Sequence, residues 1–213
     1  MKNATKSLLA ASCILASSGV LAEDSPFSAN VALTSDYVWR GVSQTNEDPA
    51  IQGGFDAAFN GFYAGTWLSN VEFGDSAHAE QDWYLGYGGE MGDFSYDVGF
   101  IEYTYIGNSD LNFGEGYIGV GYKWLSAKVS NDFDNKNLYT EIGADFTLPG
   151  EVGLGLHYGH YKFDDSTGNY NDYKIGVSKE FGGFGFELAY TDTDIDNDNL
   201  SDGRAVLTIS KSM

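Results

Sequence analysis

Cysteine is nearly absent from this chain, and histidine is scarce. The single cysteine, Cys13, lies in an apolar N-terminal segment, so the rest of the chain has no thiol and no disulfide framework. Of the three histidines, His157 and His160 are three residues apart on an expected strand. They therefore point to opposite faces and cannot bind one metal ion. We predict no cofactor and no enzymatic activity.

Basic residues are also few. The 11 lysines and arginines stand against 31 aspartates and glutamates, which gives a formal net charge of −20. Nucleic-acid-binding proteins need a basic surface, so this composition excludes that function class. The excess of acidic residues instead predicts attraction of divalent cations or cationic solutes.

Long hydrophobic runs are missing after the N-terminal segment. No later stretch is apolar enough for a membrane helix of about 20 residues. The N-terminal segment has Lys2 and Lys6, then an apolar run over 7–20, then Leu21-Ala22. This order is typical of a secretory signal peptide. We predict a signal peptide over 1–22 and one exported domain over 23–213.

Glycine and aromatic residues are abundant, whereas proline is rare. The sequence has 28 glycines, 15% aromatic residues and 3 prolines, spread over short segments of alternating polarity. A period of two indicates strands. The expected strands are 27–37, 50–59, 62–69, 82–89, 94–105, 115–122, 125–131, 138–148, 152–161, 170–179, 184–191 and 204–211. The pattern predicts an all-β fold: a single transmembrane antiparallel up-and-down β-barrel of about twelve strands, with ten or fourteen as alternatives.

The connections between these strands alternate between long and short. Short turns include Asn60-Gly61, a strong hairpin signal. The long connections are 38–49, 70–81, 106–114, 132–137, 162–169 and 192–203. Barrels of the Gram-negative outer membrane have short periplasmic turns and longer extracellular loops. The alternation therefore predicts the outer membrane as the location, with lipids and the barrel assembly machinery as partners.

Aromatic residues are concentrated near the expected strand ends. Two girdles of aromatic side chains are typical of the two membrane–water interfaces. The predicted interface residues are Tyr37, Trp39, Trp83, Tyr103, Tyr139 and Tyr190 at the outer end and Trp124 at the inner end. The alternative is that these rings fill the core of a soluble barrel.

Charged residues on the strands share a face with the polar and small side chains. If the apolar face contacts lipid, the charged residues line the lumen, because charge on the lipid face is costly. The predicted pore-lining residues are Arg40, Asp56, Asp97, Glu115, Lys128, Glu141, Asp145, His157, Asp172, Lys174 and Glu187. Such a lumen would favour cations or polar neutral solutes. The alternative is that the charges pair across the lumen and close it.

The connection 192–203 carries acidic residues at alternate positions, as calcium loops do. It departs from the strict pattern, because counting from Asp192 puts Asn197 at position six and Gly203 at position twelve. The candidate calcium ligands are Asp194, Asp196, Asp198 and Asp202. The alternative is a solvated loop that attracts divalent ions loosely.

One stretch resembles a known family. TSDYVWRGVSQ over 34–44, PAIQGGFD over 49–56 and YAGTWLSNV over 63–71 resemble the entry signature and next segment of the TorF family of porins. The resemblance implies an outer-membrane barrel that forms a pore. Barrel chains of this kind usually end in an aromatic residue, whereas this sequence ends in Met213.

These observations predict passive diffusion of small polar or cationic solutes through an outer-membrane pore. One alternative is a non-conducting surface barrel whose acidic loops bind divalent ions or a partner. Another is a soluble periplasmic β-barrel that binds a small ligand. Within the pore we expect Arg40 to lie near Asp36 or Asp56, either anchoring its loop or acting as an isolated cation that sets ion selectivity.

Overall fold

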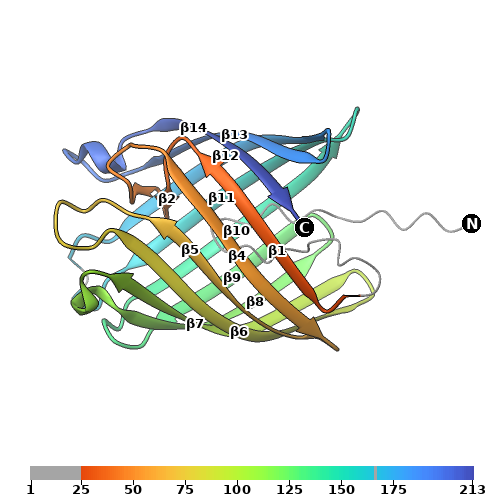
Figure 1. Ribbon diagram of the computed structural model, residues 1–213, viewed down its shortest axis with the longest axis horizontal. Helices are drawn as coiled ribbons and strands as arrows, with labels where there is room; N and C mark the ends of the chain where they lie inside the picture. Colours follow the sequence, from red (N-terminus) through yellow and green to blue (C-terminus); the bar gives the residue numbers. More distant parts are fainter. Residues whose placement is uncertain (1–24, 166) are drawn as a thin grey trace, which may run out of the picture.

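The computed structural model describes residues 25–165 and 167–213, so the predicted signal peptide lies outside the described residues. Twelve strands form a closed antiparallel barrel (Figure 1). The strands are β1 (Phe27–Thr34), β4 (Ala50–Phe59), β5 (Phe62–Asn70), β6 (Ala79–Met91), β7 (Phe94–Ile106), β8 (Phe113–Tyr122), β9 (Leu125–Asp132), β10 (Leu138–Leu148), β11 (Val152–Lys162), β12 (Tyr170–Phe181), β13 (Phe184–Thr193) and β14 (Arg204–Ser212). The predicted fold class is confirmed.

Closure is made by β1, which pairs with β4 on one side and β14 on the other. In this register Leu33 lies opposite Ile51 on β4 and Ile209 on β14. The remaining strands pair with their sequence neighbours, as in an up-and-down barrel.

The outer surface of the barrel is apolar. On β4, Ile51, Phe55 and Phe59 are 64%, 71% and 72% exposed, whereas the intervening Gln52 and Asp56 are less exposed and face inward. Successive strand residues point to opposite faces, so this alternation gives an apolar exterior and a polar interior. Such an exterior suits contact with lipid.

The two ends of the barrel differ in the length of their connections. In Figure 1 the short hairpins lie at the right end, while the long connections lie at the left with the short 3-10 helices η1 (Ser109–Leu111) and η2 (Asn199–Ser201). The tight turn Asn60-Gly61 has positive φ at both residues, +51° and +86°, as a two-residue hairpin loop requires. Within the described residues, no helix is long and apolar enough to cross a membrane.

The first long connection, over 38–49, is not the extracellular loop that the alternation of turn lengths predicts. Its residues form a small hairpin of β2 (Val38–Trp39) and β3 (Val42–Ser43), which folds into the barrel. The two tip residues, Arg40 and Gly41, have φ of +49° and +83°. This two-residue turn, which matches the twist of paired strands, lets the chain reverse inside the lumen. We call residues 35–49 the inserted loop.

Candidate functional site

The tip of the inserted loop is held by a buried ion pair. Arg40 Nη1 and Nη2 donate to Glu115 Oε1 and Oε2 on β8 at 2.8 and 2.7 Å, and both side chains are almost fully buried. The guanidinium carbon lies 4.1 Å from the ring centroids of Trp39 and Tyr139. Bidentate pairing and stacking on aromatic faces are the contacts that arginine makes best.

This pairing corrects our expectation for Arg40. Its partner is neither Asp36 nor Asp56, because the hairpin carries the tip across the lumen to β8. Asp56 instead accepts a hydrogen bond from Tyr84 of β6. Arg40 is therefore an anchored cation with its own carboxylate.

The tip also contacts β12 and β13. The Tyr170 hydroxyl of β12 donates to the Arg40 carbonyl at 3.1 Å. A Cβ added at Gly41 would collide with Thr193 and would lie 2.9 Å from the Asp172 Cβ. Glycine is required here both for its positive φ and for this close approach.

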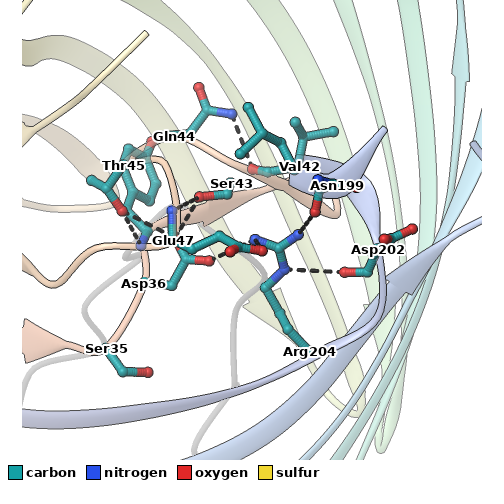
Figure 2. A network of polar contacts seen from close by, with 12 residues as sticks. Ser35, Asp36, Val42, Ser43, Gln44, Thr45, Glu47, Asn199, Asp202 and Arg204 are labelled. Atoms are coloured by element: carbon teal, nitrogen blue, oxygen red, sulfur yellow. Dashed lines mark hydrogen bonds and ion pairs between the residues drawn. The ribbon is translucent and has the colours of Figure 1, made fainter. Parts of the chain in front are cut away.

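The base of the inserted loop is fastened by a second network around Asp36, shown in Figure 2. Asp36 accepts hydrogen bonds from Ser43 Oγ at 2.7 Å and from Arg204 Nη1 of β14 at 3.0 Å. Arg204 Nη2 and Nε also donate to the carbonyls of Asn199 at 2.6 Å and Asp202 at 3.0 Å. The inserted loop is thereby joined to the 192–203 connection and to β14, far along the sequence.

The wall formed by β9 to β13 carries a row of ion pairs. Lys128 Nζ lies 2.6 Å from Glu141, and Lys174 Nζ lies 2.7 Å from Glu187. Between them, His157 Nε2 lies 2.9 Å from Asp172. These partners come from adjacent strands, so the pairs follow the strand register around the wall.

The wall formed by β4 to β8 carries tyrosines with carboxylates. Tyr84 donates to Asp56, and Tyr63 donates to Asp97 at 2.7 Å while also contacting Tyr117. A phenol hydroxyl can donate to a carboxylate, so Asp56 and Asp97 each have a tyrosine as a hydrogen-bond partner. The lumen therefore has one wall of paired charges and one of tyrosines and acids.

Every residue that we predicted to line the lumen faces the barrel interior. Asp145 lies with Lys174 and Glu187 at a small cavity of about 30 Å³ towards the short-turn end. The other ten predicted residues form the ion pairs and hydrogen bonds described above. Their role in a conducting pore stays a prediction.

The predicted aromatic girdle needs a correction. Tyr37, Tyr103 and Tyr139 are only 5%, 2% and 3% exposed and lie inside the barrel, where Trp39 packs edge-on against Tyr103. The Tyr37 hydroxyl donates to Glu80 at 2.7 Å, which gives its polar end a partner away from any membrane interface.

The other three aromatics lie on the outside. Trp83, Tyr190 and Trp124 are 53%, 49% and 52% exposed. Strand parity separates the two groups, since Tyr103 shares a face with Asp97 on β7 and Tyr139 shares a face with Glu141 on β10. Nearness to a strand end, on which the predicted girdle rests, does not distinguish the two faces of a strand.

The candidate calcium ligands do not converge. Hydrogen bonds from the Asn171 backbone and side chain occupy Asp194 and lower the pKa of its carboxyl below the ordinary value. Asp198 caps η2 by accepting from Leu200 N. Across residues 25–165 and 167–213, no three histidine or carboxylate side chains could hold a metal ion. Asp196 and Asp202 therefore do not complete a site.

A cavity of about 270 Å³ lies in the lumen beside the inserted loop. It is lined by the hairpin tip, by the ion-paired wall and by Trp67, Asp82, Tyr84 and Tyr103 of the facing wall. Our sequence reasoning missed Asp82 and Arg204. Asp82 could have been found, because it shares a strand face with the glycines that alternate with Trp83, Leu85 and Tyr87. Arg204 could not, because its partner Asp36 is 168 residues away.

Closure, an apolar exterior and a polar lumen narrowed by a folded-in loop define a barrel of the porin-like class. Among solved structures, a KdgM porin matches with a TM-score of 0.64 and 13% identity, over 87% of this chain and 99% of that chain. A KdgM porin in complex with disordered oligogalacturonate matches with a TM-score of 0.62 and 13% identity, over 88% and 98%. At these identities the likeness concerns the fold.

The family is established from the sequence match. A family model described as "Bacterial protein of unknown function (Gcw_chp)" matches residues 21–213, and the chain belongs to that family. A search of curated proteins finds no match.

Proposed function

We propose that this protein is an outer-membrane porin that allows passive diffusion of small polar or cationic solutes, exported with a signal peptide over 1–22. The observation that carries the proposal is the combination of an apolar barrel exterior with a lumen of charged side chains around a cavity of about 270 Å³. The resemblance of residues 34–71 to the TorF family of porins points in the same direction.

The lumen chemistry supports a preference for cations. In the lumen, Lys128 and Lys174 of the β9 to β13 wall each lie within 3 Å of a carboxylate, whereas the facing wall carries carboxylates that accept hydrogen bonds from tyrosines. A narrow passage with surplus acid favours entry of cations over anions. Oligogalacturonate, bound by the matching KdgM porin, carries a carboxylate on each sugar, so we do not extend that solute to this chain.

Planar-bilayer recording tests this function. The refolded protein, checked by heat-modifiable migration on gels, should give stepwise conductance, and the reversal potential in a potassium chloride gradient should have the sign of a cation-selective channel. Folded protein that leaves the bilayer silent would contradict a porin, and anion selectivity would contradict the proposed solute class.

A second candidate is a non-conducting outer-membrane barrel. The observation in its favour is the firm attachment of the inserted loop at both its base and its tip. Silent bilayers with wild-type protein, followed by conductance once the loop is released by mutation, would favour this candidate. The soluble periplasmic barrel predicts recovery of the protein in the periplasmic fraction, which the apolar exterior opposes.

A further inference from the structure

Three buried polar atoms in the lumen lie in one row. Trp67 on β5, Asp82 on β6 and Tyr103 on β7 are direct cross-strand neighbours, Trp67 opposite Asp82 and Asp82 opposite Tyr103. Side chains at such positions share a face, with Cβ atoms about 5 Å apart. All three line the cavity of about 270 Å³.

Each of the three has a polar atom without a partner in the described part of the chain. These atoms are Trp67 Nε1, Asp82 Oδ1 and Tyr103 Oη. Asp82 is 6% exposed and Tyr103 is 2% exposed, so bulk water does not solvate them. Buried polar atoms nearly always have a hydrogen-bond partner, and exceptions often mark a place where something binds.

Apart from Asp82, the charged side chains around the cavity have partners. Asp36 pairs with Arg204, and Arg40 pairs with Glu115. Lys128, His157 and Lys174 each lie beside a carboxylate of the neighbouring strand. Among the charged cavity-lining side chains of the described residues, Asp82 is the one with a buried carboxylate oxygen, Oδ1, that has no hydrogen-bond partner. An unpaired buried carboxylate is costly, and a bound cation would remove that cost.

Aromatic rings surround this carboxylate. Trp67, Tyr84 and Tyr103 line the same cavity. From the inserted loop, Trp39 packs edge-on against Tyr103, and Tyr37 packs edge-on against Trp67. Aromatic faces attract organic cations, most strongly where water is excluded. Indole N–H donates only, whereas phenol can donate or accept, so a ligand that also carries an acceptor would use all three atoms.

We propose that Trp67, Asp82 and Tyr103 form a binding site for a small organic ammonium ion, whose N–H groups donate to Asp82 and whose alkyl part packs on the aromatic rings. The cavity volume is near the lower end for ligand pockets, which limits the ligand to a small solute. This site rests on the proposed function, because it names the class of solute that the pore would select.

Calorimetry on the full-length protein in detergent tests the site without transport. The probes are n-propylammonium chloride, the neutral n-propanol as its uncharged analogue, and tetramethylammonium chloride as a cation without N–H. We expect propylammonium to bind, propanol not to bind, and tetramethylammonium to bind more weakly. Asp82→Asn should weaken propylammonium binding at least about tenfold, because a hydrogen bond to a charged group is lost.

The matched control is Asp93→Asn, which removes one carboxylate from an exposed turn where Asp93 lies 3.4 Å from Lys123. It should leave binding unchanged. Asp82→Asn should also fold with equal or greater resistance to urea, since it removes an unpaired buried charge. Absence of propylammonium binding, equal binding by Asp82→Asn, or equal binding of propanol would each overturn the site.

Bilayer recordings separate this inference from the proposed function. Conductance without propylammonium binding would overturn the binding site but would still support the proposed porin function. Binding without conductance would support the site and contradict the porin.

Discussion

At the scale of single residues, Arg40 shows most clearly how the lumen is built. Its side chain is almost fully buried, and its guanidinium makes two hydrogen bonds to one carboxylate and lies against aromatic rings. A buried charge is tolerated only with such a partner. The structure thus favours the anchoring role for Arg40 over the role of an isolated selectivity cation.

Arg40→Ala should destabilise the barrel by about 3–5 kcal/mol, because it leaves Glu115 buried without its cation. Urea unfolding followed by the shift of the folded band on gels measures this. The double variant Arg40→Ala/Glu115→Gln should recover part of the loss, since it also removes the unpaired charge. A double variant as unstable as Arg40→Ala would contradict this explanation.

Gly41 is the second residue on which the hairpin tip depends. Gly41→Ala should cost about 1–2 kcal/mol for the left-handed backbone and should also displace the tip, because its Cβ collides with Thr193. We expect a larger single-channel conductance. Gly74→Ala is the matched control: its φ is +74°, and an added Cβ meets nothing within 4 Å. Equal conductance changes in the two variants would show that the collision is irrelevant.

At the scale of elements, the inserted loop is the feature that decides how open the lumen is. The loop is joined to β8 and β12 at its tip and to β14 at its base. The tip attachment crosses the lumen, whereas the base attachment joins the loop to β14, the neighbour of β1. Tyr37 of the loop also donates to Glu80 of β6, so the ribbon β2–β3 is held at several separate points. Releasing the base should mobilise the loop while the tip remains paired.

Arg204→Ala removes the contacts that hold the base. It eliminates the 3.0 Å pair with Asp36 and the 3.3 Å pair with Glu47. We expect more frequent transitions between conductance levels in bilayer recordings, because the base of the loop then loses its bonds to β14. Lys123→Ala, which removes a cation from an exposed pair worth at most about 1 kcal/mol, should behave like the wild type. If Arg204→Ala shows no more transitions than the wild type, the contacts of Arg204 do not hold the loop in place.

At the scale of the whole molecule, the apolar exterior is the property that supports a membrane location for the barrel. Ile118 lies in the middle of β8 and is 60% exposed on this surface. Ile118→Lys should cost about 2–4 kcal/mol if that face contacts the bilayer midplane. Folding yield into lipid vesicles measures the effect. Leu111→Lys, on η1 in a long connection, introduces the same charge and should fold normally.

A result in which both lysine variants fold equally well would contradict a lipid-facing position for β8. A result in which Leu111→Lys alone fails would place the membrane at the long-loop end instead. Fractionation of cells that express the wild-type protein should recover it with the outer membrane.

Local patterns determined much of the barrel. Alternation, turn residues such as Asn60-Gly61 and the order of long and short connections were sufficient to predict twelve strands, their approximate bounds and the inward direction of charges such as Asp97 and Glu141. These features are local, because each strand follows a two-residue period whatever its neighbours are. Closure follows when the first and last strands satisfy each other's backbone groups.

The contents of the lumen were decided by tertiary structure alone. The sequence of residues 38–49 is typical of a polar surface loop, yet these residues fold inward. Arg40 pairs with Glu115, which is 75 residues away, and Asp36 pairs with Arg204, which is 168 residues away. The unpartnered row of Trp67, Asp82 and Tyr103 likewise exists only in the register of three strands. Pairings between distant segments depend on barrel closure and register, which a period of two in one segment does not encode.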